Sequence, residues 1–434
     1  MLMRQLDFRG KKFTKSELKR ALPRGNFSIS DALKKIEPIL QRVEKASESD
    51  LLDICQELDG VRPQSIRVSR EALDKALNNL DKEVRAALEE SIRRVRKVHA
   101  DQLPELKATE VSAGGTVTRK WIPVDRVGTY APGGLATYPS SVIMNVVPAQ
   151  IAGVSRVAVA SPPQKKNGGL PDEIVLATCK LLDVDEVFAI GGAQAVAMFA
   201  YGVPELCESV DIVTGPGNIY VAAAKRALRG LIGIDSEAGP TEIMVLADAN
   251  ANPVHVASDL ISQAEHDELA AAILVTNSVE LSNKVQEIVA ERAAATKHAK
   301  RVQTSLSAAQ SGIVLVDTLD DGFSVINAYA PEHLELLIEN AEKLANKVRN
   351  AGAIFLGTYS PVSLGDYAAG SNHVLPTGGC ACHSSALSVN TFLKNVSQIE
   401  YSKEALAEIA AQVVKLAEAE NLPAHGEAIT ARFE

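Results

Sequence analysis

Two series of short β-rich runs, each run followed by a helical pattern, constrain the fold of this chain most strongly. The first series begins near Val127 and contains residues 156–160, 186–190 and 210–213. The second series contains residues 243–247, 271–275, 312–316 and 353–356. Strands that alternate with helices in this way are typical of a parallel sheet, so we predict an α/β fold with two units of similar build.

The length of the chain fits this arrangement. Its 434 residues exceed one ordinary hydrophobic core, so two or three domains are expected. The first 25 residues are charged and end at Pro23-Arg24-Gly25, which we interpret as an arm that precedes the first domain. From Ser69 to about His99, apolar residues at spacings of three and four predict one long amphipathic helix, with Ser69 as its cap.

The composition excludes several classes of function. A net charge of −9 argues against a nucleic-acid partner, because phosphate contacts need clustered Lys and Arg. No apolar run is long enough to span a membrane, and the N-terminus lacks the apolar segment of a signal peptide. The five scattered cysteines indicate a reducing cytoplasm rather than a disulfide framework. Cys380 and Cys382 have no second cysteine pair to close a tetrahedral metal site, so we interpret them as ordinary thiols.

Three glycine-rich turns in the first series stand where ligands bind in open α/β sheets. They are residues 130–134, which belong to a turn-rich loop at residues 128–134, and residues 191–194 and 215–218. Glycine lets a backbone approach a phosphate or ribose closely, and the start of a helix favours an anion. None of the three turns is the G-x-G-x-x-G fingerprint of dinucleotide sites. The turns alone therefore leave both a nucleotide site and ordinary strand–helix connections open.

A polar segment in the second series carries two side chains that could bind a metal. Asn252 and Pro253 predict the start of a helix that reaches residues 262–266, Ser-Gln-Ala-Glu-His. Gln263 and His266 are three residues apart and leave the same face of that helix. An amide oxygen beside an imidazole can begin a divalent-metal site, but two ligands cannot complete one. A polar patch at a helix end is the alternative interpretation.

Further histidines and acids lie in turn-like settings late in the chain. Glu332 and His333 are adjacent, and Asp366 and His373 lie in a Gly/Ser-rich stretch. His425 stands near the C-terminus, with Glu420 shortly before it. Any one of these histidines could be a surface or capping residue. Together with Gln263, these side chains supply nitrogen and oxygen ligands for one divalent ion and spare groups for acid–base chemistry.

The order of these motifs resembles that of the histidinol dehydrogenase family. The matching segments are residues 130–134, 191–194, 215–218, 262–266, 331–333, 365–367, 371–376 and 424–426. The resemblance runs from the N-terminal arm to the last residues, and residues 378–385 are similar to the form found in actinobacteria. It implies a cytoplasmic enzyme of histidine biosynthesis that oxidises L-histidinol through the aldehyde to L-histidine and consumes two NAD per substrate.

The resemblance also implies roles for individual residues. One zinc ion per subunit would be held by Gln263, His266, Asp366 and, from a second subunit, His425; these four would also contact the substrate. His333 would take the hydroxyl proton, and Glu332 would activate water in the second half-reaction. The remaining substrate contacts would be Thr241, His333, His373 and Glu420, and the NAD contacts would be Tyr130, Gln194 and Asn218. Many family members carry Ser where this chain has Thr241, so the extra methyl group must be accommodated.

The family pattern implies two incomplete Rossmann-like domains with parallel sheets. Residues 26–127 and 240–383 would form the metal and substrate domain, with an NAD-binding domain at residues 128–239 inserted into it. Residues 1–25 and 384–434 would be arms that take part in forming a homodimer with shared active sites. A related zinc and NAD dehydrogenase for another small polar alcohol, such as sulfopropanediol, is the nearest alternative. A non-catalytic metal- or nucleotide-binding protein is a second alternative, although such a protein has no need of the adjacent pair Glu332 and His333.

Overall fold

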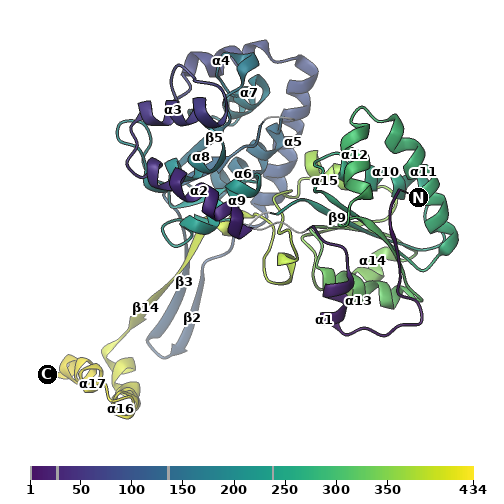
Figure 1. Cartoon of the computed structure of the whole chain (residues 1–434). Helices are drawn as coiled ribbons and strands as arrows, with labels where there is room; N and C mark the ends of the chain where they lie inside the picture. The colour runs from purple at the N-terminus through teal and green to yellow at the C-terminus, as the bar shows by residue number, and fades with distance from the viewer. Residues whose placement is uncertain (1, 26–28, 134–136, 237–238) are drawn as a thin grey trace.

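The structure is a computed structural model that describes residues 2–25, 29–133, 137–236 and 239–434. Two parallel sheets, each covered by helices on both faces, stand side by side, and a long arm extends away from them (Figure 1). This architecture confirms the predicted α/β fold with two parallel sheets. No helix within the described ranges combines the length and the apolar character needed to cross a membrane.

The larger sheet has six parallel strands in the order β1-β11-β10-β9-β12-β13. They are β1 (Gln5–Asp7), β9 (Glu242–Ala247), β10 (Ala271–Thr276), β11 (Gly312–Leu315), β12 (His333–Leu337) and β13 (Ala353–Leu356). On β9, Ile243 and Val245 pack against α10 (Pro253–Ala264), α11 (Val279–Ala295) and α12 (Ala299–Ser307). Met244 and Leu246 point the other way, toward α1 (Lys15–Ala21), α13 (Leu319–Tyr329) and α14 (Ala341–Leu344). Both faces are buried, as a parallel sheet requires.

The smaller sheet has five parallel strands in the order β6-β5-β4-β7-β8. They are β4 (Arg126–Tyr130), β5 (Arg156–Ser161), β6 (Glu186–Ala189), β7 (Ile212–Thr214) and β8 (Gly233–Ile234). One face is covered by α2 (Ile29–Val43), α3 (Glu48–Leu58), α8 (Gly192–Tyr201) and α9 (Ile219–Leu228). The other face is covered by α4 (Arg70–Asn79), α5 (Lys82–Ala100), α6 (Pro139–Ala152) and α7 (Glu173–Leu181).

The packing of the N-terminal helices differs from the predicted domain boundaries. Residues 26–127 were expected to belong with residues 240–383, but helices α2 to α5 pack on the smaller sheet. The chain starts in the larger sheet with β1, crosses to the smaller sheet before α2, and returns to the larger sheet at β9. The insertion therefore begins about a hundred residues earlier than expected. An amphipathic stripe shows that a helix is buried, but not against which sheet.

The helix predicted from Ser69 to His99 is two helices. Ser69 caps α4 as expected, through a hydrogen bond from the Ala72 N–H. Leu80 then adopts an extended conformation, and the Asp81 carboxylate accepts the N–H groups that start α5. Asp is a strong N-cap residue, and its capping interaction interrupts a pattern whose apolar spacing alone looks continuous.

Seven strands lie within two residues of their predicted positions. The strands β1, β4, β8 and β12 of the parallel sheets were not predicted, nor was the antiparallel sheet of β2, β3 and β14. Residues 128–134 were expected to form a turn, but β4 continues to Tyr130, and Gly134 lies outside the described residues. Gly128 lies within this strand. Glycine is needed there because a Cβ would lie 2.6 Å from the ring of Phe199. A glycine required for packing was thus interpreted as a glycine required for a turn.

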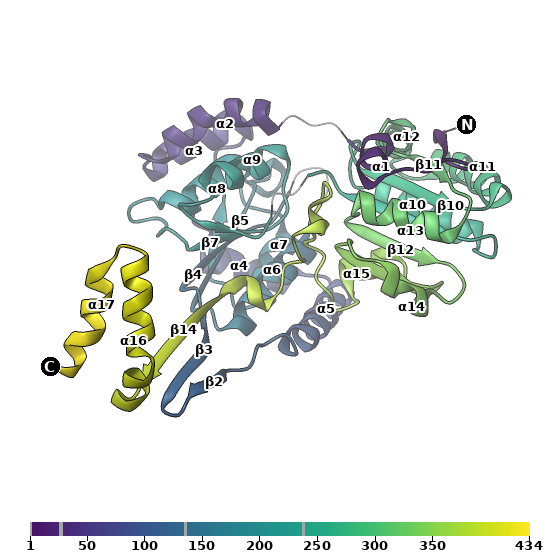
Figure 2. The ribbon, with the colours of Figure 1, turned by 90° about the horizontal axis from the view of Figure 1, so that it is seen from below.

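The arm begins with an antiparallel sheet in which β14 (Leu393–Tyr401) and β2 (Lys107–Ser112) flank β3 (Gly115–Pro123). It ends with α16 (Lys403–Ala419) and α17 (Pro423–Thr430), which lie apart from both parallel sheets in two views (Figures 1 and 2). Several large apolar side chains on the arm are exposed, among them Leu106, Ile399 and Leu416. Between β13 and the arm lies α15 (Val362–Tyr367); the short 3₁₀ turns are at Lys165–Asn167, Ala345–Lys347, Cys380–Cys382, Val389–Phe392 and Ala431–Phe433.

Candidate active site

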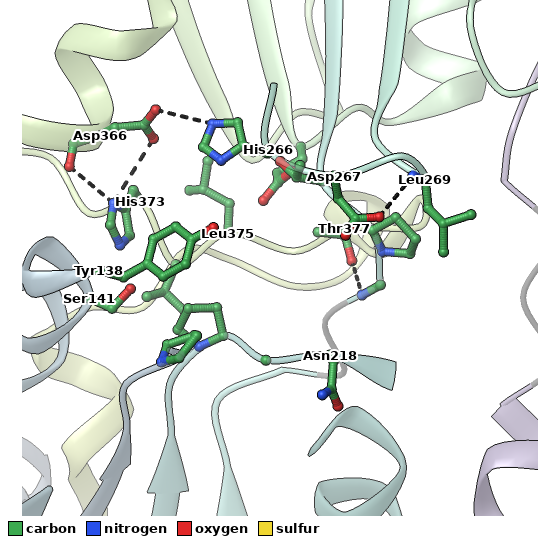
Figure 3. A pocket seen from close by; sticks show the side chains of 18 of the residues that line it. Tyr138, Ser141, Asn218, His266, Asp267, Leu269, Asp366, His373, Leu375 and Thr377 are labelled. Atoms are coloured by element: carbon green, nitrogen blue, oxygen red, sulfur yellow. Dashed lines mark hydrogen bonds and ion pairs between the residues drawn. The ribbon is translucent and has the colours of Figure 1, made fainter. Parts of the chain in front are cut away.

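A cavity of about 510 Å³ lies where loops of the two parallel sheets meet (Figure 3). The smaller sheet contributes Pro132 and Gly133 after β4, and residues 216–219 after β7. The larger sheet contributes side chains from several segments: Thr241, His266, Asp267, Glu332, His333, Asp366, His373 and Thr377. Most of the residues singled out in the sequence therefore meet in one cavity, although they are spread over about 250 positions.

The smaller sheet presents the end at which open α/β sheets bind ligands. From β4 the chain continues to β5 and β6 on one side, whereas β7 and β8 lie on the other side. The cavity stands at the carboxyl ends of β4 and β7, which is the point where the strand order reverses. The turns after these two strands thus stand at the end of the sheet where open α/β sheets bind ligands, as the sequence indicated.

The larger sheet presents its opposite end. Thr241 directly precedes β9, and His333 is the first residue of β12, so both lie at the amino ends of parallel strands. The side chains that could perform chemistry thus line the cavity together with the turns at the carboxyl ends of β4 and β7. The cavity has one wall of backbone turns and one wall of titratable side chains.

Glu332 and His333 form a buried pair at the floor of this cavity. The Oε2 atom of Glu332 accepts hydrogen bonds from the Thr241 hydroxyl and the Glu242 N–H, both at 2.7 Å. Nδ1 of His333 lies 3.4 Å from the same Oε2 and 3.1 Å from the carbonyl oxygen of Glu242. Nδ1 is therefore the nitrogen that donates within the protein, which makes Nε2 the nitrogen able to exchange a proton with a ligand.

The two side chains shift each other's pKa. Burial alone would raise the pKa of Glu332, but the charge of His333 and the hydrogen bonds from His333, Thr241 and Glu242 outweigh it, so the pKa is lowered. Burial would lower the pKa of His333, but the adjacent Glu332 carboxylate raises it to about 9. The pair is thus ionised near neutral pH, and His333 becomes a base as the pH rises.

A second cluster lines the same cavity, where Asp366 stands between two imidazoles (Figure 3). Its Oδ2 atom is 3.8 Å from Nε2 of His266, and its backbone oxygen is 3.1 Å from Nδ1 of His373. Burial lowers the pKa of His373 despite the nearby carboxylate, so this imidazole is neutral and can bind a polar ligand. His266 follows α10, and Asp366 lies on α15, so packing of these two helices sets the spacing.

The residues of this cluster fit part of a metal site. Each metal–ligand bond of a zinc site is about 2 Å long, and the spacing of Asp366 and His266 is close to that of two ligands on one ion. Gln263 is almost fully buried, and its Nε2 atom donates to the Thr241 hydroxyl at 2.6 Å. Within the described ranges, no three His, Cys, Asp or Glu side chains gather closely enough to hold a metal ion. A complete site would therefore need the Gln263 amide and a ligand from elsewhere.

Two predicted site residues lie far from the cavity. Glu420 caps the C-terminal end of α16, and His425 is on α17, both exposed on the arm. Neither lines the cavity of its own chain. In the single chain, these residues are separated from the other predicted ligands.

The three predicted NAD contacts lie at the ends of three elements of the smaller sheet. Asn218 is exposed, lines the cavity and caps α9 by accepting the Tyr220 N–H. Tyr130 ends β4, and its buried hydroxyl accepts the Gly192 N–H at 3.1 Å. Gln194 lies in the first turn of α8. Tyr130 and Gln194 do not line this cavity and lie toward the side of the sheet that leads from β4 to β6.

A buried ion pair fixes the turn that carries Asn218. Lys225 donates to the carbonyl of Gly215 at 2.6 Å and to the Asp235 carboxylate at 2.5 Å, and this carboxylate accepts the Gly215 N–H at 2.8 Å. A Cβ on Gly215 would lie 2.1 Å from the carbonyl oxygen of Tyr130, so only glycine fits. The turn is thus held rigidly against the end of β4.

The sequence did not reveal several residues that support the site. The first 25 residues, expected to form an arm, instead join the larger sheet through β1 and α1. Arg24, which follows α1, lies 3.2 Å from the buried carboxylate of Glu242 and stacks on the ring of Tyr329. The Thr377 hydroxyl accepts the Gly239 N–H at 2.5 Å, and Tyr138 lines the cavity. Arg24 falls within residues 23–25, and Thr377 directly follows residues 371–376, both of which were singled out in the sequence. Their closeness to these segments was the one sequence feature that could have indicated them. Tyr138 and Asp235 had no such signal.

The comparisons with known proteins concern the whole chain. A family model described as histidinol dehydrogenase matches residues 22–433. The histidinol dehydrogenase of Streptomyces avermitilis is 59% identical over 434 residues, which are 100% of this chain and 98% of that protein. The histidinol dehydrogenase of Thermobifida fusca is 58% identical over 429 residues, which cover 99% of this chain and 97% of that protein. A crystal structure of histidinol dehydrogenase from Elizabethkingia anophelis matches with a TM-score of 0.93 at 32% identity. The match covers 100% of this chain and 98% of that chain.

Proposed function

The chain belongs to the histidinol dehydrogenase family, and we propose that it oxidises L-histidinol through L-histidinaldehyde to L-histidine, consuming two NAD. These are the last steps of histidine biosynthesis. The single observation that carries the detailed proposal is the adjacent pair Glu332 and His333, which lines the same cavity as the cluster around Asp366. A reaction with two oxidation steps needs two groups that accept protons, and this pair supplies them.

We propose that His266 and Asp366, joined by Gln263 and by His425 of a second subunit, hold one zinc ion per subunit. A bound zinc ion would supply a fixed positive charge that orients the substrate without changing its own oxidation state. Gln263 would have to turn its amide oxygen to the metal, and its amide nitrogen already points to Thr241. His373 and Thr241, together with Glu420 of the second subunit, complete the proposed substrate contacts.

His333 takes the hydroxyl proton of the alcohol in the first half-reaction. Its Nδ1 atom is held by the Glu242 carbonyl and by Glu332, so Nε2 is the nitrogen that accepts this proton. NAD, when bound, supplies the acceptor for the hydride that leaves the carbinol carbon. The negative charge of Glu332 stabilises the imidazolium that forms.

Glu332 acts in the second half-reaction by taking a proton from the water that adds to the aldehyde. Its low pKa keeps the carboxylate ionised, and the Thr241 and Glu242 hydrogen bonds fix its orientation. Both half-reactions thus use groups that touch each other, so the substrate need not leave between them. Tyr130, Gln194 and Asn218 are the proposed contacts to NAD.

We propose that the enzyme is a homodimer in which the arm of each chain completes the site of the other. Exposed apolar residues on the arm, such as Ile399 and Leu416, would be covered by the second subunit. His425 and Glu420 would then reach a cavity that they cannot reach in their own chain. We also propose that the enzyme works in the cytoplasm, a reducing compartment consistent with its few, scattered cysteines.

The stoichiometry of NADH formation tests this function. Purified enzyme supplied with zinc, excess NAD and a limiting amount of L-histidinol should form two NADH per histidinol, with L-histidine as the product. Sulfopropanediol in place of histidinol should give no comparable rate. One NADH per histidinol, with free aldehyde in the medium, would contradict the proposed sequence of two oxidations.

A further inference from the structure

Asp59 places a carboxylate beside two of the proposed NAD contacts. It directly follows α3, and its Oδ2 atom accepts a hydrogen bond from Nε2 of Gln194 at 3.4 Å. The buried hydroxyl of Tyr130 and the Gly192 N–H lie in the same group of side chains. Asp59 thus stands over the carboxyl ends of β4 and β6, where a ligand of this sheet is expected.

The position of Asp59 is fixed by contacts between the N-terminal helices and β6. The Cys55 thiol lies 3.9 Å from the carbonyl oxygen of Ala189, and the Ala189 N–H donates to the carbonyl of Ile66 at 2.7 Å. These contacts hold the end of α3 and the segment after Asp59 along the edge of the smaller sheet. The packing of α3 on β6 therefore fixes the position of the Asp59 carboxylate.

Among the described residues, Asp59 has no cation as a partner. Its neighbours on α3 are paired, Asp53 with Arg62 and Glu57 with Arg42. The one hydrogen bond that Asp59 accepts is long, at 3.4 Å, and comes from a neutral amide. Burial raises the pKa of Asp59 to about 6, so the group is still largely ionised at neutral pH. A half-buried, ionised carboxylate without a strong partner has unused capacity to accept hydrogen bonds.

The direction in which a dinucleotide must lie decides which part of it reaches Asp59. The reacting end belongs beside Glu332 and His333, in the cavity at the ends of β4 and β7. Asp59, Gln194 and Tyr130 lie outside that cavity, toward β6. A dinucleotide that contacts both Asn218 and Gln194 therefore brings its adenosine half to Asp59.

We propose that Asp59 binds the ribose hydroxyls of the adenosine half of NAD and thereby selects NAD over NADP. This inference rests on the proposed NAD-linked function. The Asp59 carboxylate accepts hydrogen bonds from both hydroxyls of an unmodified ribose. A 2′-phosphate would instead bring a second anion next to a partly desolvated carboxylate, with no cation to compensate. Ordinary dinucleotide folds use an acidic residue for this purpose, placed within the sheet about 20 residues after the glycine-rich turn. Here the acid precedes the sheet, so a fingerprint search cannot find it.

The substitution Asp59→Asn tests the proposal, with Glu57→Gln as the matched control on the same helix. Initial rates are measured at saturating histidinol with NAD and with NADP. In Asp59→Asn, the KM for NAD should rise about tenfold or more, because a charge-assisted hydrogen bond is lost, while kcat stays within about twofold. The ratio of kcat/KM for NAD to that for NADP should fall by at least about tenfold. Glu57→Gln should leave both quantities unchanged.

Binding to the unaltered protein provides a measurement that does not depend on a variant folding correctly. Calorimetry should show that ADP-ribose binds at least about tenfold more tightly than its 2′-phosphorylated form. Equal affinity for the two compounds would overturn the proposal. A KM rise in Asp59→Asn with an unchanged NAD to NADP ratio would also overturn it, since that result indicates a purely structural role. Absence of NAD-linked histidinol oxidation in the unaltered enzyme would instead contradict the proposed function itself.

Discussion

The chemistry of this chain depends on how a buried carboxylate is kept ionised. Burying Glu332 is unfavourable unless its charge is compensated, and the compensation comes from one hydroxyl, one backbone N–H and one imidazole. All three act on the same oxygen, Oε2. The two side chains stabilise each other's charged form: His333 lowers the pKa of Glu332, and Glu332 raises the pKa of His333.

The pH dependence of the first oxidation follows from this pair. His333 accepts a proton only when its imidazole is neutral, and Glu332 raises the pKa of that imidazole to about 9. The neutral fraction therefore increases about tenfold per pH unit below that value. We expect kcat/KM for histidinol to increase from pH 7 toward pH 9 and then to level off, and His333→Asn to remove most of the increase. A rate that is constant from pH 7 to 9 would contradict this assignment.

Thr241 joins the proposed water-activating base, Glu332, to a proposed metal ligand, Gln263. Its hydroxyl donates to Glu332 and accepts from Gln263, so Thr241→Val leaves two buried polar groups without this partner. We expect this variant to lose about 1–3 kcal/mol of stability and to be slowed mainly in aldehyde oxidation. Thr241→Ser keeps both hydrogen bonds and is the matched control, expected to stay near wild type in urea unfolding and in turnover. A strong defect in Thr241→Ser would mean that the methyl group, not the hydroxyl, is essential.

At the scale of elements, ionisable pairs hold the turns and helices that carry the site. Lys225 and Asp235 are both almost fully buried and fix the Gly215 turn in front of α9. Removing one member of a buried pair leaves an uncompensated charge, so Lys225→Met should lower the unfolding free energy by about 3–5 kcal/mol. The double variant Lys225→Met with Asp235→Leu should recover part of that loss. Urea unfolding measures both, and a single variant as stable as wild type would show that the pair contributes little.

A second buried pair joins the helix of Gln263 to the strand of His333. Glu335 on β12 is hydrogen-bonded to Asp259 on α10. Burial and the Asp259 charge raise the pKa of Glu335 to about 9. The two carboxyl groups therefore share a proton at neutral pH. The shared proton prevents two like charges from separating α10 and β12.

The stability of the protein should therefore decrease with increasing pH through this pair. Above the ordinary carboxyl value of 4.5, the unfolded chain has lost the Glu335 proton while the folded chain keeps it. The unfolded state then binds fewer protons, so the unfolding free energy decreases as the pH rises, until the folded pKa of about 9 is reached. Glu335→Gln keeps a hydrogen-bond donor to Asp259 and should make this decrease shallower. Parallel slopes for the variant and wild type between pH 5 and 9 would contradict the shared proton.

At the scale of the whole molecule, sequence patterns predicted the elements better than their assembly. The β-rich runs of both series became strands because Val, Ile and Ala runs between turn residues form buried parallel strands whatever surrounds them. The partners of α2 to α5 could not be predicted, since an apolar stripe packs equally well on either sheet. Glu332, His333, His266 and Asp366 were singled out from the motifs and line one cavity. Asp59 was not singled out, because only folding brings it to Gln194.

The arm is the part of the molecule whose proposed role depends on a second chain. His425 and Glu420 lie on exposed helices outside the cavity, while His266 and Asp366 line it. If His425 completes the site of the partner, each site of a two-fold dimer combines His266 of one chain with His425 of the other. We therefore expect His266→Ala and His425→Ala each to be inactive as homodimers.

Mixtures of these two inactive variants should regain activity. When equal amounts are unfolded together and refolded with zinc, random assembly makes half of the dimers mixed, and each mixed dimer has one intact site and one site with both changes. The mixture should thus reach roughly a quarter of wild-type activity. A mixture of His266→Ala with Asp366→Ala is the matched control. It should stay inactive, because each site takes both residues from the same chain and therefore always lacks one of them. If His425 served its own chain, every site would lack a ligand, so an inactive but properly refolded mixture would contradict the shared site.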